Sequence, residues 1–121
     1  ADALSSFYNA TVELGVSNSV TAFTASDFGR TLSSNGDGSD HGWGSHHLVL
    51  GGAVKGKAFY GTAPAIAVNG TDDVGQGRLL PTTSVDQFAA TLASWFGVSG
   101  TELGLVVPNI ANYSLKNVGF V

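Results

Sequence analysis

The segment from Ser26 to Ser45 places the strongest constraint on how this chain can fold. It is rich in residues that favour turns: Gly29, Gly36, Gly38, Gly42, Gly44, Asp27, Asn35, Asp37 and Asp40. No hydrophobic period runs through it, which predicts an irregular loop rather than a helix or strand. Long irregular loops in otherwise apolar domains tend to carry function. We therefore expect the chemistry of the molecule to lie in this segment.

The rest of the chain has the composition of a folded protein. Of its 121 residues, 43% are hydrophobic and only 12% are charged, which argues against intrinsic disorder. The net charge is −4, and the five basic residues form no stripe, so a nucleic-acid partner is not expected. No stretch approaches the roughly 18 apolar residues of a membrane span. The absence of cysteine excludes disulfides and thiolate zinc sites.

Hydrophobic spacing around the glycine-rich segment predicts alternating helices and strands, and therefore an α/β architecture. The clearest element is a helix over residues 85–96, because Ser84 and Gln87 have the spacing of a capping box and Gly97 follows the last apolar residue. Apolar patterning predicts further helices over residues 3–14 and 101–106, and strands over 19–25, 46–50, 58–60 and 65–68. Residues 1–121 are expected to form a single domain or the C-terminal fragment of a larger one. The chain begins at Ala1 rather than Met, which we interpret as processing or truncation.

The candidate site is a metal site. All three histidines lie close together, and Asp40 precedes His41 directly. Carboxylate oxygen and imidazole nitrogen are ligands for zinc, manganese and similar divalent ions, and neighbouring residues can share an ion only from a turn. We predict Asp40, His41 and His46 as ligands. Of His46 and His47, only one can face the loop.

Two alternatives remain open at this point. Asp and His also occur in surface loops without any ligand, and Asn35 to Ser39 alternates oxygen donors as the start of a calcium loop does. Arg30 is a candidate for binding a substrate oxyanion, and the competing interpretation is a structural ion pair with Asp27 or Asp40.

Several motifs together resemble an uncharacterised bacterial family whose members look like sulfatases and alkaline phosphatases and are often exported by the twin-arginine route. The resemblance spans roughly residues 4–113. It rests on residues 23–31, 35–44, 50–56, 77–83 and the Trp95-Phe96-Gly97 end of the predicted helix.

This resemblance implies the C-terminal portion of an alkaline-phosphatase-like sandwich, with helices packed on a mixed sheet. In that superfamily an Asp-His-Gly segment at a strand end binds a divalent metal, which implies that role for Asp40 and His41. The resemblance also implies a periplasmic or secreted hydrolase of phosphate or sulfate esters. No histidine follows His47, and the upstream nucleophile has no counterpart in these residues, so the active site of such an enzyme is incomplete here.

The expected partner is therefore the missing N-terminal part of the same protein, or a second copy through self-association. The alternative function is a non-catalytic secreted protein or self-assembling structural subunit whose metal site serves stability.

Overall fold

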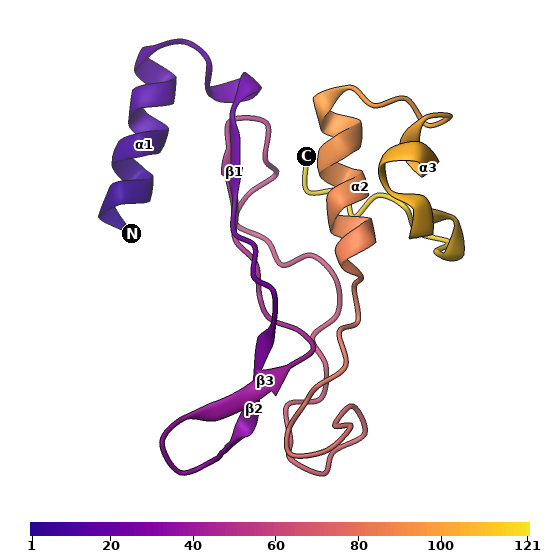
Figure 1. Ribbon diagram of the computed structural model, residues 1–121. Helices are drawn as coiled ribbons and strands as arrows, with labels where there is room; N and C mark the ends of the chain where they lie inside the picture. The colour runs from indigo at the N-terminus through magenta and orange to yellow at the C-terminus, as the bar shows by residue number, and fades with distance from the viewer.

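The computed structural model describes residues 1–121 as an open arrangement of helices and two small sheets (Figure 1). The elements follow in the order α1 (Asp2–Glu13), η1 (Ser17–Ser19), β1 (Thr21–Phe23), β2 (Gly29–Ser34), β3 (Ser39–Gly42), β4 (Val49–Gly51), α2 (Val85–Phe96), α3 (Leu103–Val106) and η2 (Pro108–Asn112). The protein is thus a mixed α/β domain, and its sheets are antiparallel rather than mixed. No helix combines the length and hydrophobicity needed to cross a membrane.

Both sheets have two strands. β1 pairs with β4, with Ala22 opposite Leu50, and β2 pairs with β3, with Arg30 opposite His41. The β2–β3 hairpin extends away from the helices, whereas β1 lies between α1 and α2 (Figure 1). Because a two-stranded sheet is marginally stable alone, each of the two sheets depends on contacts from other segments.

The hydrophobic core lies among the C-terminal helices. Its buried cluster consists of Ala90, Leu103, Val107 and Ile110. Helix α2 begins with the predicted capping box, since the Ser84 hydroxyl accepts the Asp86 amide and the Gln87 side chain accepts the Ser84 amide. It ends at Gly97, whose φ of 108° is a left-handed conformation that glycine adopts without steric cost.

The structure corrects several expectations about the strands. The expected loop at 26–45 contains the β2–β3 hairpin, because backbone pairing across the turn overrides the weak strand propensity of its glycine, serine and aspartate residues. The strand expected over 46–50 begins only at Val49, and residues 58–60 and 65–68 form no strand. The helices expected over 3–14, 85–96 and 101–106 are confirmed as α1, α2 and α3, with ends shifted by up to two residues.

Candidate functional site

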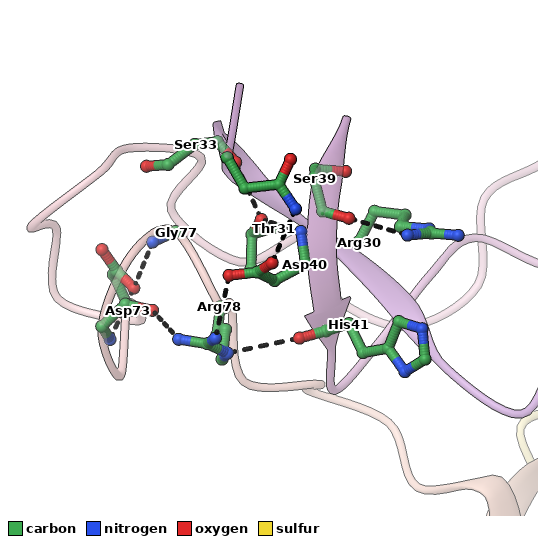
Figure 2. A network of polar contacts seen from close by, with 11 residues as sticks. Arg30, Thr31, Ser33, Ser39, Asp40, His41, Asp73, Gly77 and Arg78 are labelled. Carbon is green, nitrogen blue, oxygen red and sulfur yellow. Dashed lines mark hydrogen bonds and ion pairs between the residues drawn. The ribbon is translucent and has the colours of Figure 1, made fainter. Parts of the chain in front are cut away.

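Asp40 and His41 are neighbours on β3, and their side chains leave opposite faces of the hairpin (Figure 2). This divergence follows from strand geometry, in which successive side chains alternate between the two faces. The turn that was expected to point both groups toward one ion is therefore absent from the structure. Each face has its own set of partners.

On the first face, the carboxylate of Asp40 is held from two sides. The Asn35 side-chain amide donates to its Oδ1 at 2.8 Å, and one Arg78 guanidinium nitrogen lies 3.6 Å from its Oδ2. The backbone amide of Asp40 donates to the Thr31 hydroxyl at 3.1 Å, close to the register shift between β2 and β3. Both charged side chains are part-exposed, so the ion pair orients the carboxylate more than it stabilises the fold.

Arg78 reaches this position from a tight turn built around Asp73. The Asp73 carboxylate accepts backbone amides from Asn69 at 2.7 Å, Gly75 at 2.7 Å and Gly77 at 2.9 Å. These hydrogen bonds, with that from Asn69 contributing most, hold the pKa of Asp73 below its ordinary value of 3.8. The carboxylate therefore remains ionised and keeps the turn closed at neutral pH.

The turn docks against β2 and β3 through backbone and side-chain contacts. The amides of Leu32 and Ser33 donate to the carbonyls of Gly77 and Gln76, at 3.0 and 3.3 Å. Arg78 Nε donates to the His41 carbonyl at 3.2 Å, which connects the turn to β3 as well (Figure 2). The turn thus adds to the outer side of β2 much as a further strand would.

On the second face, His41 lies against an aromatic ring. Its imidazole stacks on Phe28 with a centroid separation of 3.5 Å and an interplanar angle of 11°. The Arg30 guanidinium carbon lies 5.0 Å from the centroid of the same ring, and Arg30 donates to the Ser39 carbonyl at 2.7 Å. The nitrogens of the exposed imidazole are free of hydrogen bonds within the chain.

The anion-binding role predicted for Arg30 stays a prediction. The competing interpretation was an ion pair of Arg30 with Asp27 or Asp40. Arg30 forms neither pair, and the ion pair of Asp40 is with Arg78. Local sequence gave no signal for Arg78 as this partner, since the pair is separated by 38 positions and forms only when the turn at Asp73 docks.

The two following histidines have different surroundings. The Nδ1 atom of His47 lies 3.3 Å from the Thr24 hydroxyl, and its ring packs at 5.9 Å from Phe88. His46 is exposed, and its imidazole makes no hydrogen bond or aromatic contact within the chain. Trp43, which is 66% exposed, leaves most of its indole in solvent near the end of β3.

The chain nowhere gathers three or more histidine, cysteine, aspartate or glutamate side chains in a geometry that could hold a metal ion. Asp40 and His41 supply suitable donor atoms but do not converge on one ion in this arrangement. The donors thus fit a divalent metal only in part, and their role as ligands, together with that of His46, stays a prediction.

A family model described as "Protein of unknown function (DUF1501)" matches residues 1–106. No protein among curated sequences and no solved structure shows significant similarity to the chain.

Proposed function

We propose that the chain, which belongs to the DUF1501 family, is the metal-binding C-terminal part of a larger hydrolase that resembles sulfatases and alkaline phosphatases. In this proposal the protein is exported by the twin-arginine route, acts in the periplasm or outside the cell, and cleaves phosphate or sulfate esters. The chain supplies part of an alkaline-phosphatase-like sandwich, and the missing N-terminal part of the same protein supplies the rest.

The observation that carries the proposal is the availability of the His41 imidazole and the fixed orientation of the Asp40 carboxylate. The imidazole is exposed with free nitrogens, and the adjacent carboxylate is already oriented by Asn35 and Arg78. Hydrogen-bonded partners that orient a ligand are typical of metal sites. Because fewer than three ligands meet within this chain, the remaining ones must come from outside it.

A bound zinc, manganese or calcium ion would polarise an ester oxygen and activate a nucleophile. The residues of this chain would offer donors on the two faces of the hairpin. Asp40 presents a carboxylate held in place from two sides, His41 presents an imidazole stacked on Phe28, and His46 is available as an additional donor. Arg30 lies on the same face as His41 and is the candidate for binding a sulfate or phosphate oxygen.

The experiment is calorimetric titration of the chain, expressed together with the upstream part, with zinc, manganese and calcium salts, repeated on Asp40→Asn, His41→Ala and His47→Ala. His47 is the matched control, because its ring nitrogen already has a partner in Thr24. We expect His41→Ala and Asp40→Asn each to weaken metal binding, and His47→Ala to leave it unchanged. Equal binding in all four proteins would refute the metal assignment.

Esterase assays with nitrophenyl phosphate and nitrophenyl sulfate then test the reaction, with the upstream part expressed together with the chain. Metal-dependent turnover that is lost in Asp40→Asn and His41→Ala is the expected result. Turnover that is indifferent to both substitutions would contradict it.

One observation favours a second candidate function, a non-catalytic secreted protein. Both carboxylate oxygens of Asp40 already have partners: Asn35 within the hairpin, and Arg78, which joins the turn at Asp73 to the hairpin. This is a structural use of the residue. In that case metal would raise the melting temperature, by an amount that grows with the logarithm of its concentration above the dissociation constant, with no ester cleavage.

A further inference from the structure

The loop that joins β2 to β3 has the sequence Asn35-Gly36-Asp37-Gly38, and all four residues are exposed. It lies at the end of the hairpin that points away from the helices (Figure 1). Asparagine is a thermolabile residue, and it loses its side-chain amide most readily when glycine follows, because no Cβ then separates the next backbone nitrogen from the side chain. The chain contains this pair twice, at residues 35–36 and 69–70.

The Gly36 amide is weakly held. It makes no hydrogen bond to a backbone carbonyl, and its acceptor is the hydroxyl of Ser34, an exposed side chain, at 3.2 Å. A Cβ built on Gly36 would meet no atom within 4 Å, so the backbone has room to move toward the Asn35 side chain. Gly36 therefore presents an accessible and unobstructed nitrogen to the side-chain carbon of Asn35.

The second pair, Asn69 and Gly70, is held more firmly. The Gly70 amide donates to the Ala67 carbonyl at 3.1 Å, and the Asn69 amide donates to the Asp73 carboxylate at 2.7 Å. A Cβ built on Gly70 would lie 3.0 Å from both the Cβ and the carbonyl oxygen of Ala67, so this turn is closely packed. Movement of Gly70 toward the Asn69 side chain would break a backbone hydrogen bond and disturb the turn around Asp73.

We propose that Asn35 is a site of spontaneous deamidation whose rate is limited by its hydrogen bond to Asp40. The Gly36 nitrogen gives its proton to solvent and attacks Asn35 Cγ. An N–Cγ bond forms, the Cγ–Nδ2 bond breaks, and the amide nitrogen takes a proton from solvent and leaves as ammonia. Water then opens the cyclic imide. Attack at Cγ gives aspartate, and attack at the backbone carbonyl carbon gives isoaspartate, whose main chain runs through the former side chain.

The contact with Asp40 slows the first step. Asn35 Nδ2 donates to Asp40 Oδ1 at 2.8 Å, which holds the side-chain amide against β3. This bond must break before Cγ can turn toward the Gly36 nitrogen. Asn35 is exposed and Asp40 is part-exposed, so the bond should slow deamidation by about 2- to 10-fold, the factor that corresponds to one ordinary hydrogen bond.

Deamidation would change the surroundings of Asp40. Either product replaces a donating amide with a carboxylate, so Asp40 Oδ1 loses its donor and meets a like charge. Arg78 then remains as the partner of the Asp40 carboxylate. Isoaspartate also lengthens the main chain next to the Ser34–Ser39 pair that closes the hairpin. The inference is independent of the proposed metal chemistry, because the reaction requires only these residues and water.

The test is incubation of the chain, expressed together with the upstream part, in heavy-oxygen water at mildly alkaline pH, followed by peptide mass spectrometry. Heavy oxygen should enter residue 35 before residue 69, and the labelled peptide should separate into aspartate and isoaspartate forms. In urea, which removes the contacts of both pairs, the two rates should converge. No label at residue 35, label first at residue 69, or the same difference between the two rates in urea would overturn the inference.

Two variants test the contact with Asp40. Asp40→Ala releases the Asn35 amide, so the rate at Asn35 should rise by about 2- to 10-fold over that of the natural chain. Arg78→Ala is the matched control, because it loosens the same hairpin but keeps the bond between Asn35 and Asp40, and it should leave the rate at Asn35 near its natural value. Equal acceleration in both variants, or none in Asp40→Ala, would overturn the inference.

Discussion

Replacing Arg78 by alanine should release the turn around Asp73 from the β2–β3 hairpin. Arg78 makes three contacts: Nε to the His41 carbonyl at 3.2 Å, one terminal nitrogen to the Gly75 carbonyl at 3.3 Å, and the other to the Asp40 carboxylate at 3.6 Å. The first and third cross from the turn to β3. Without them, the turn is held mainly by the backbone bonds between Gln76, Gly77 and β2.

The size of the expected loss in docking free energy follows from these distances and from the partial exposure of the Arg78 and Asp40 side chains. A hydrogen bond contributes about 0.5–1.5 kcal/mol, and a part-exposed ion pair about 0–1 kcal/mol. The hydrogen bond to His41 is long, so the lower part of the range applies, and the bond to Gly75 lies within the turn and does not oppose undocking. The loss should be about 0.5–2 kcal/mol, which corresponds to a roughly 2- to 30-fold increase in the population of the undocked turn.

Hydrogen exchange measured by NMR reports this directly. The amides of Leu32 and Ser33 donate across the docking interface to the Gly77 and Gln76 carbonyls, so their exchange should accelerate by the same factor. The Val118 amide, which donates to the Thr91 hydroxyl in another part of the fold, should exchange at its original rate. Lys116→Ala is the matched control, because it removes an exposed cation without any contact in the structure.

Two outcomes would refute this reasoning. Unchanged exchange at Leu32 and Ser33 in Arg78→Ala would mean that the side chain does not hold the turn. Equal acceleration at Val118 would mean that the substitution destabilises the whole chain. Asp40→Asn should produce a smaller effect than Arg78→Ala, because Arg78 keeps its two carbonyl acceptors.

Three further predictions concern local structure. Gly77→Ala should destabilise the docked turn by about 1–3 kcal/mol, because its φ is 76° and a Cβ would lie 2.8 Å from the Leu32 nitrogen. Hydrogen exchange at the Leu32 amide measures this loss. Gly100→Ala is the control, because a Cβ added at Gly100 meets no neighbour. Because the pKa of Asp73 is lowered on folding, the contribution of its carboxylate to stability should be complete above pH 3.8 and be lost as the pH falls below that value. Acid titration of the NMR chemical shifts of the Gly75 and Gly77 amides, compared with Asp73→Asn, tests whether the pKa is lowered. Ser84→Ala should destabilise α2 by about 1 kcal/mol through loss of the cap, measured by thermal denaturation followed at 222 nm.

The helices could be predicted because their signals are local. The capping box at Ser84 and Gln87, the left-handed Gly97 and the apolar spacing between them are all contained within one short stretch. The same holds for α1, whose apolar residues repeat at helical intervals although the helix has no partner within the chain. In both cases backbone hydrogen bonds join residues four apart, so the sequence nearby is sufficient.

The β2–β3 hairpin could not be predicted in this way, because its strands contain few residues with strand propensity. Its stability comes from pairing between strands and from Arg78, which approaches from 38 positions away in sequence. Sequence spacing identified Asp40 and His41 as the residues with the most distinctive chemistry, but their relative orientation depends on whether they lie in a turn or a strand. Strand geometry separates their side chains and leaves each with its own partners.

This separation has a consequence for how any metal would bind. A single ion could reach both side chains only if residues 40–42 left the strand conformation, which would break the Arg30–His41 pairing and the Arg78 contacts to β3. Two ions, one on each face, would leave the hairpin intact and would each require ligands from outside the chain. The hydrogen-exchange rates of the hairpin amides during metal titration therefore distinguish the two arrangements. Faster exchange at β3 indicates one shared ion, and unchanged or slower exchange indicates separate ions on opposite faces.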